Sequence, residues 1–200
     1  MIVLDVESSG VDPNKNSILS LGALDFDEPT NRFYEECRIW DGAHIVDEAL
    51  AVNGFTREQA EDPAKQSEAE LIQKFLTWAT DRPKERTLLG HNPSFDRDFV
   101  AAALRRAHLD NPFAHRTIDT HSICWLHMVT HGVVPPVDPV RKHSSLNLDA
   151  ALRYCGIPDE PDPHNGLTGA LSAAEVTSRL AYTKKLLPEF AAYDIPWLTI

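Results

Sequence analysis

The chain has 200 residues, of which 42% are hydrophobic and 24% are charged, and these proportions are typical of a globular domain. Its 19 Lys and Arg residues against 30 Asp and Glu residues give a formal net charge of −11, which argues against a protein that coats nucleic acid through a broad basic surface. No apolar run approaches the roughly 20 residues of a transmembrane helix, so we expect no membrane partner.

Strand signals dominate the first 40 residues. Segments at residues 2–4, 17–26 and 32–40 are predicted as strands, and the short turn-rich links between them suit an antiparallel meander. The pattern changes to helix near Asp47. Residues 68–79 then place apolar side chains on one face at helical spacing, which predicts a helix.

The rest of the chain alternates between strand and helix signals. Short strands are predicted at residues 86–91 and 117–120, and Asn92 or Ser94 is a candidate cap for the helix that follows the first of them. Proline-rich loops are predicted at residues 132–145 and 159–163. The predicted helices occupy residues 95–108, the stretch from the last strand to residue 131, and residues 146–155 and 167–184.

These elements predict one α/β domain with a mixed sheet flanked by helices. The domain covers residues 1–187, and residues 188–200 form a C-terminal tail. The first ten residues, MIVLDVESSG, lack the basic start and the cleavage site of a signal peptide. The three cysteines, Cys37, Cys124 and Cys155, form no CxxC pair, which argues against a disulfide framework or a zinc knuckle. We therefore expect a cytoplasmic protein.

Two carboxylates end the first predicted strand. Asp5 and Glu7 are two residues apart, so their side chains point to the same face of the strand. Like charges at this distance repel each other unless a cation lies between them. The pair is either a solvent-exposed strand end or part of a metal site.

Two further residues are candidates for the same chemistry. Asp96 lies near the start of a predicted helix, where carboxylates are common because the helix dipole favours them. His164 lies in a proline-rich loop, away from any apolar run that would explain it as a core residue. Histidine changes its protonation near neutral pH, which suits a general base.

The order of three segments carries more information than any one of them. DVESSG, HNPSFDRDF and PHNGLTGA, spread from Asp5 to Glu175, resemble the three motifs of the DEDDh family of DnaQ-like 3′–5′ exonucleases. The second motif is the most specific, and TIDT and LNLDAALRYCGIP are similar to connecting segments of that family. The residues that match in the second motif are Asn92, Phe95, Asp96 and Phe99.

The resemblance implies a fold and a mechanism. The fold is RNase H-like, with a five-stranded mixed sheet whose first three strands are antiparallel and whose remaining strands are parallel. Two ions, Mg²⁺ or Mn²⁺, would be held by Asp5, Glu7 and Asp96 at the 3′ end of single-stranded DNA or RNA, and His164 would act as the general base. The product would be a 5′-mononucleotide. The substrate contacts that the resemblance implies are Gly10, Val11, Phe95 and Asn92.

The chain departs from the family at the fourth acid. The family has an aspartate five residues after the histidine, and here that position is Gly169. The simplest interpretation is a site with three protein carboxylates in which water completes the metal shell. This predicts better activity with Mn²⁺ than with Mg²⁺, and higher activity for Gly169→Asp.

Other acidic residues are candidates for the missing ligand. Glu175 falls on a different face of the last helix from residue 169, so either a structural role or a surface charge is expected for it. The loop before His164 carries three carboxylates, any of which could swing into the site. These are Asp159, Glu160 and Asp162.

Two alternative functions and one assembly state remain open. Gly169 favours a nucleic-acid-binding module that keeps the fold and has lost turnover. The many histidines, among them His127 and His131 at helical spacing, allow an unrelated metal phosphohydrolase, although no HExxH motif surrounds them. Members of the family are often dimers, so a homodimer is possible on the resemblance alone. The choice between DNA and RNA is not determined by the sequence.

Overall fold

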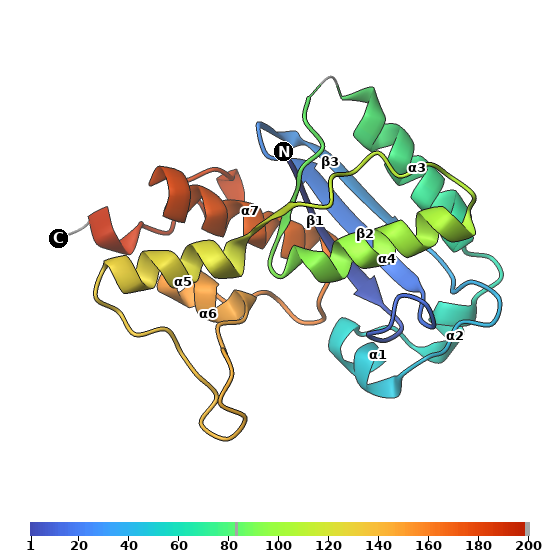
Figure 1. Ribbon diagram of the computed structural model, residues 1–200, viewed down its shortest axis with the longest axis horizontal. Coiled ribbons are helices and arrows are strands. Elements are labelled where there is room, and N and C mark those ends of the chain that lie inside the picture. The colour runs from blue at the N-terminus through green and yellow to red at the C-terminus, as the bar shows by residue number, and fades with distance from the viewer. Residues whose placement is uncertain (83, 199–200) are drawn as a thin grey trace.

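The computed structural model describes residues 1–82 and 84–198, and five strands in these residues form one sheet (Figure 1). The strand order is β3-β2-β1-β4-β5, with the first three strands antiparallel and β4 and β5 parallel to β1. The predicted five-stranded mixed sheet is confirmed. The strands are β1 (Ile2–Ser8), β2 (Ile18–Asp25), β3 (Glu28–Glu36), β4 (Leu88–Gly90) and β5 (Thr117–Asp119).

The predicted helices are present, with one helix added. Helix α2 (Arg57–Glu61) was not predicted, although Thr56 and Gln59 form a capping box at its start. The other helices are α1 (Asp47–Asn53), α3 (Glu68–Asp81), α4 (Pro93–Arg106), α5 (Thr120–Thr130), α6 (Leu148–Tyr154) and α7 (Gly166–Tyr182), followed by the short 3₁₀ turns η1 (Pro188–Phe190) and η2 (Pro196–Leu198). No helix of the described ranges is long and apolar enough to cross a membrane.

One predicted strand is displaced. The prediction at residues 32–40 is wrong in its limits, because β3 begins at Glu28 and ends at Glu36. The strand starts directly after a tight turn that pairs Asp25 with Glu28. It lies at the edge of the sheet and is partly exposed throughout, so its first residues carry no apolar signal.

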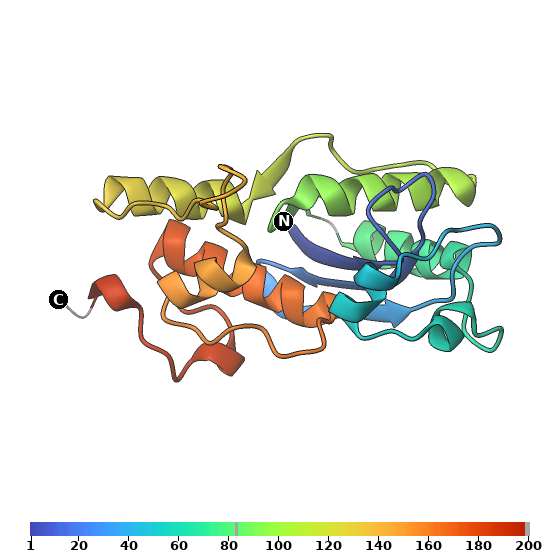
Figure 2. The ribbon, with the colours of Figure 1, turned by 90° about the horizontal axis from the view of Figure 1, so that it is seen from below.

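The sheet has a separate apolar core on each face. Ile2, Leu4 and Val6 of β1 belong to the cluster that α3 and α4 cover, whereas Val3 belongs to the cluster that includes Ala170 of α7. This alternation follows from the two-residue period of a strand. Figure 2 shows the resulting layers, with the sheet between α3 and α4 above and α7 below. The odd-numbered residues of β1 therefore face α7.

The C-terminal tail packs against α7. The fully buried Arg179 donates to the carbonyl oxygens of Phe190, Tyr193 and Asp194. It also donates to the carbonyl oxygen of Cys155 and pairs with Glu175 at 2.8 Å. Glu175 in turn accepts two backbone N–H groups from residues 186 and 187. Glu175 thus has a structural role, which was one of the two expected for it. Residues 199–200 of the predicted tail lie outside the described residues.

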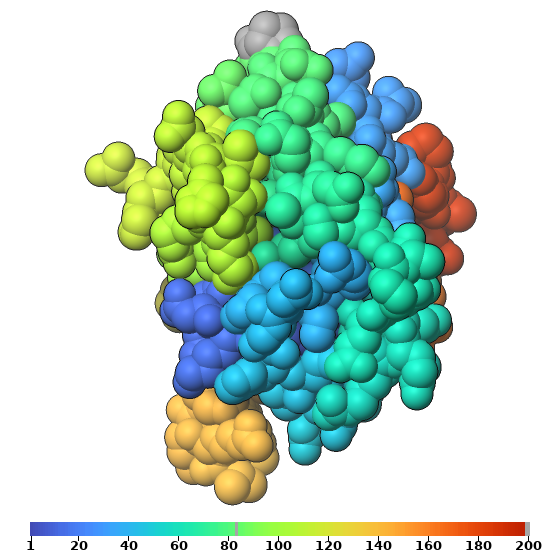
Figure 3. Space-filling view, turned by 90° about the vertical axis from the view of Figure 1, so that its right-hand side faces the viewer, coloured from blue at the N-terminus to red at the C-terminus, as the bar shows by residue number. Residues whose placement is uncertain are grey.

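The predicted loop at residues 132–145 projects from the body of the molecule. Figure 1 shows it extending away from α5 and α6, and Figure 3 shows it as a separate lobe below the sheet domain. It carries exposed Arg141, Lys142 and His143.

Candidate active site

The end of β1 is open on one side. Strand β4 pairs with β1 only at Ile2 and Val3, so the backbone of β1 beyond Leu4 has no strand partner on that edge. The N–H of Val6 points to this gap, where it donates to Asp96 Oδ1 at 2.9 Å. Asp96 therefore satisfies a backbone group that the short β4 leaves unpaired, and its position beside β1 follows from the sheet topology.

The first turn of α4 delivers Asp96 to this gap. Asn92 takes a left-handed conformation at the N-cap of α4, and Pro93 follows as the first helical residue. Asn92 is therefore the N-cap residue, one of the two candidates, but its side chain makes no capping hydrogen bond. The backbone N–H of Asn92 instead donates to Asp119 at the end of β5.

Glycines allow α7 to begin directly on the sheet. A Cβ atom at Gly22 of β2 would lie 2.1 Å from the backbone of Gly166, and a Cβ atom at Gly166 would lie 2.9 Å from the carbonyl oxygen of Asp5. Only hydrogen atoms fit in these gaps. Because His164 comes two residues before Gly166, this contact brings the loop histidine to the end of β1.

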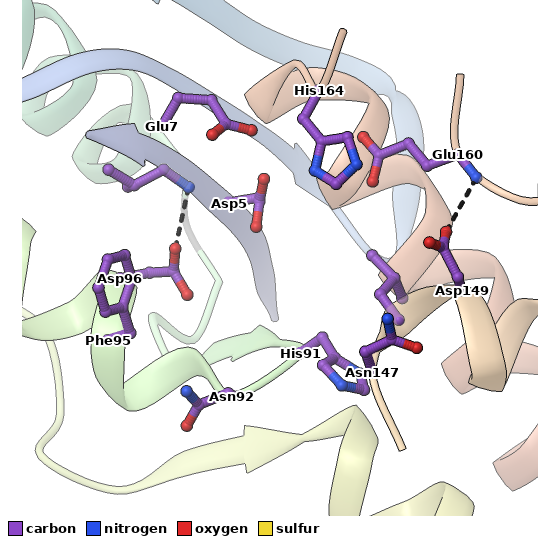
Figure 4. Close-up of a pocket in the computed structure, with 12 residues that line it drawn as sticks. Asp5, Glu7, His91, Asn92, Phe95, Asp96, Asn147, Asp149, Glu160 and His164 are labelled. Atoms are coloured by element: carbon purple, nitrogen blue, oxygen red, sulfur yellow. Dashed lines mark hydrogen bonds between the residues drawn. The ribbon is translucent and has the colours of Figure 1, made fainter. Parts of the chain in front are cut away.

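Most of the predicted site residues line one cavity of about 230 Å³. Figure 4 shows the side chains of Asp5, Glu7, Asp96 and His164 directed toward it from β1, α4 and the loop before α7. Three parts of the chain that are far apart in sequence thus meet at one pocket. The full lining is Asp5, Val6, Glu7, His91, Asn92, Phe95, Asp96, Asn147, Leu148, Asp149, Glu160 and His164.

Two predicted substrate contacts lie outside this cavity lining. Gly10 is in the turn after β1, where an added Cβ atom would lie 2.4 Å from the side chain of Asn16, so its small size has a packing reason. Val11 is 80% exposed.

Burial raises the pKa of each carboxylate. The pKa of Asp5 is raised well above its usual range, mainly by desolvation and then by the charges of Asp96, Glu7 and Glu160. Desolvation raises the pKa of Glu7 to about 7, and the nearby His164 opposes that rise. Desolvation also raises the pKa of Asp96 to about 7 against the hydrogen bond from Val6. The site therefore gathers negative charge at a free-energy cost.

The donor set fits a divalent cation. Among the described residues, no group hydrogen-bonds to the carboxylates of Asp5 and Glu7 or forms a close ion pair with them. Asp5 and Glu7 are partly buried, and carboxylates withdrawn from water are normally paired or coordinate metals. Carboxylate oxygens are the ligands of Mg²⁺ and related ions. In residues 1–82 and 84–198 no three His, Cys, Asp or Glu side chains are already close enough to hold one ion. Side-chain rotation would have to bring these carboxylates together.

The raised pKa of Asp96 predicts a specific pH dependence of stability. In chelator, the wild-type free energy of unfolding should fall as pH rises from about 4 to about 7, because the folded state holds the Asp96 proton more tightly than the unfolded chain does. The change from 3.8 to about 7 corresponds to at most roughly 4 kcal/mol. Asp96→Asn should lose much of this dependence, as denaturant titrations at pH 5 and pH 8 would measure. Equal slopes for the two proteins would contradict the assignment.

Position 169 faces Asp5. A Cβ atom at Gly169 would lie 2.4 Å from Asp5 Oδ2 and 2.7 Å from Asp5 Cγ. A side chain at position 169 would therefore stand beside the carboxylate of Asp5. Asp5 already occupies this space, so the new side chain of Gly169→Asp would have to displace it. This crowding counts against the expectation that Gly169→Asp raises activity, and that expectation stays a prediction.

Four polar residues of the pocket lining were not assigned to the site from the sequence, although Glu160 was a candidate for the missing ligand. They come from the end of β4, the start of α6 and the loop before α7. Their sequence signals are the first residue of HNPSFDRDF, the segment LNLDAALRYCGIP, which is similar to a connecting segment of the family, and the run of carboxylates before the histidine. They are His91, Asn147, Asp149 and Glu160.

The histidine pair at helical spacing has a different environment. The rings of His127 and His131 stack with centroids 4.0 Å apart, and Trp197 and Tyr154 pack against His127. Desolvation and the neighbouring His131 lower the pKa of His127. The aromatic packing explains this pair without a metal ion.

The comparisons with known proteins identify the family of the chain. The RNase_T family model, described as exonuclease, matches residues 2–177. The chain belongs to the exonuclease family. It is a nuclease with an RNase H-like fold, so the interpretation as an unrelated phosphohydrolase is wrong.

Similar sequences carry the name ribonuclease T. The protein from Haemophilus influenzae is 30% identical over 168 residues, which cover 72% of each chain. The protein from Yersinia enterocolitica is 27% identical over 184 residues, which cover 77% of this chain and 82% of that one. Both alignments extend over most of the domain.

Solved structures share the fold at lower identity. The nuclease domain of 3′hExo, a DEDDh family member bound to rAMP, has a TM-score of 0.68 and 18% identity over 93% of both chains. E. coli exonuclease I in complex with a dT13 oligonucleotide carrying 5cy has a TM-score of 0.70 and 18% identity over 92% of this chain. This chain spans only 40% of exonuclease I.

Proposed function

We propose that this exonuclease removes nucleotides from the 3′ end of single-stranded DNA or RNA and releases 5′-mononucleotides, with two Mg²⁺ or Mn²⁺ ions as cofactors. The observation that carries the proposal is the convergence of Asp5, Glu7, Asp96 and His164 on one cavity. The structures of exonuclease I with single-stranded oligonucleotides support the substrate class.

Each residue has a distinct part in the proposed reaction. Asp5, Glu7 and Asp96 would hold the divalent ions, which when bound make a water molecule more acidic and stabilise the leaving oxygen. The imidazole of His164 accepts the proton of the attacking water. Its side chain is 35% exposed, so solvent can take up that proton after the reaction.

The walls of the cavity suit the end of a single strand. Phe95 lines the pocket and packs against Phe99 with ring centroids 4.8 Å apart, which fixes its orientation. Asn92 lines the same pocket. Val11, three residues after the end of β1, has an exposed apolar side chain. Stacking on an aromatic ring such as that of Phe95 holds a base without reading its identity. We therefore assign Gly10, Val11, Asn92 and Phe95 to the substrate in this proposal.

Strands labelled at either end test the proposal. With Mg²⁺ or Mn²⁺, a 3′ label should be released at once as a mononucleotide, whereas a 5′ label should remain on a ladder of shortening products. DNA and RNA are compared in parallel, and Asp5→Ala should lose at least about 10³-fold in rate because it removes a metal ligand. Shortening from the 5′ end, or internal cleavage, would contradict the proposed reaction.

Gly169 supports a second candidate function. A chain without the family's fourth acid could bind a 3′ end and release it unchanged. The same assay separates the two functions, because retention of a labelled strand on the protein without any shortening favours the binding module. The homodimer and the cytoplasmic location rest on the sequence alone and stay predictions.

A further inference from the structure

Glu160 lies in the wall of the cavity, although it belongs to none of the motifs that define the family resemblance. It is in the loop between α6 and α7, four residues before His164. Figure 4 shows its side chain beside His164 and directed toward the pocket that Asp5 and Glu7 enter from β1. Its charge is close enough to Asp5 and Glu7 to help raise the pKa of both carboxylates.

Contacts at both ends hold Glu160 in place. Its backbone N–H donates to Asp149 Oδ1 at 3.1 Å, and the hydroxyl of Thr168 donates to its Oε1 at 2.5 Å. Thr168 is the residue before Gly169 in the first turn of α7. The Glu160 carboxylate is therefore hydrogen-bonded to the first turn of α7, which is the turn that lacks the family's fourth acid.

The other acidic candidates have different partners. Asp159 pairs with Arg153 at 2.5 Å on the surface, and Asp162 has a 92% exposed side chain. Neither residue lines the cavity. Glu175 is fully buried in its ion pair with Arg179. Of the acids weighed as substitutes, Glu160 is the one in the pocket wall.

We propose that Glu160 supplies the acidic metal ligand that Gly169 cannot, so that the carboxylates of this site are Asp5, Glu7, Asp96 and Glu160. The inference rests on the proposed function, since it assigns a residue to the same metal site. The glycine at position 169 and the glutamate at position 160 are complementary features of this chain. A glycine at position 169 leaves room for Asp5 against α7, and the loop before His164 provides a carboxylate from the opposite side of the imidazole.

Calorimetric titration of the full chain with Mn²⁺ tests the assignment. Glu160→Gln keeps an oxygen that can accept from Thr168 but removes the charge, so the fold should be retained and its melting temperature in chelator should stay close to that of the wild type. The variant should bind Mn²⁺ at least about tenfold more weakly, a loss in the range known for groups that support a metal site. Asp159→Asn is the control, because it removes the same charge from the neighbouring position and should bind as the wild type does.

The outcomes separate this inference from the proposed function. Equal Mn²⁺ affinity of Glu160→Gln and the wild type would overturn the assignment of Glu160 and leave the exonuclease proposal intact. Weaker binding by Glu160→Gln in a chain that shortens no strand would support the assignment and contradict the exonuclease proposal. An equal loss of affinity in Asp159→Asn would also overturn the assignment, because it would trace the effect to the charge of the whole loop.

Discussion

Replacing His164 by alanine should lower the rate of strand shortening by roughly 10²–10⁴-fold, the range that positioned general acids and bases contribute. The imidazole lines the cavity that Asp5 and Glu7 enter, and its only close ion-pair contact among the described residues is Asp162, at 3.8 Å. Its loss therefore removes the proposed proton acceptor together with one contact to a largely exposed carboxylate. Initial rates on a 5′-labelled strand at saturating Mn²⁺ would measure the effect.

The same variant has a second readout that distinguishes catalysis from structure. His164→Ala should bind Mn²⁺ within about threefold of the wild type, because the carboxylates that hold the ion remain. His143→Ala, in the projecting loop, is the matched control and should keep full activity. A His164→Ala protein with more than a tenth of the wild-type rate would show that another group accepts the proton.

The sequence motifs predict most of the side chains that meet in the cavity but not the distances between them. The motifs around Asp5, Asp96 and His164 identify the side chains, and the period of β1 places Asp5 and Glu7 on one face. How near these side chains come depends on two packing details. Strand β4 is too short to cover the end of β1, and Gly22 and Gly166 let α7 touch the sheet. Neither detail has a local pattern that reveals it.

The sequence also could not distinguish Glu160 from the other acidic residues of its loop. Its sequence neighbours Asp159 and Asp162 are equally acidic, and no period or cap distinguishes the three. Contacts with Asp149 and Thr168 select Glu160, and both partners lie on helices that meet the loop only in the folded chain. When tertiary contacts decide which acidic residue enters a pocket, the amino-acid sequence of the loop does not identify that residue.

Gly169→Ala should lower both the rate of strand shortening and the affinity for Mn²⁺, the rate by about 10²-fold. The added methyl group would lie 2.4 Å from Asp5 Oδ2, so the carboxylate of Asp5 must turn away, and a displacement of about 1 Å at a reacting centre can cost this much. The fold should tolerate the change, since Asp5 can rotate and alanine favours a helix over glycine by about 1 kcal/mol. Melting temperatures in chelator would confirm that the helix is intact.

Gly132→Ala provides the matched comparison for Gly169→Ala, because nothing lies within 4 Å of a Cβ atom at position 132. It should keep its activity, even if its positive φ of 72° lowers its stability. Gly169→Asp adds a carboxylate at the same crowded point, so we expect no gain over Gly169→Ala. If Gly169→Asp instead exceeds the wild type in rate and in Mn²⁺ affinity, Asp5 can yield its place, and the site is limited by the missing acid rather than by the space beside α7.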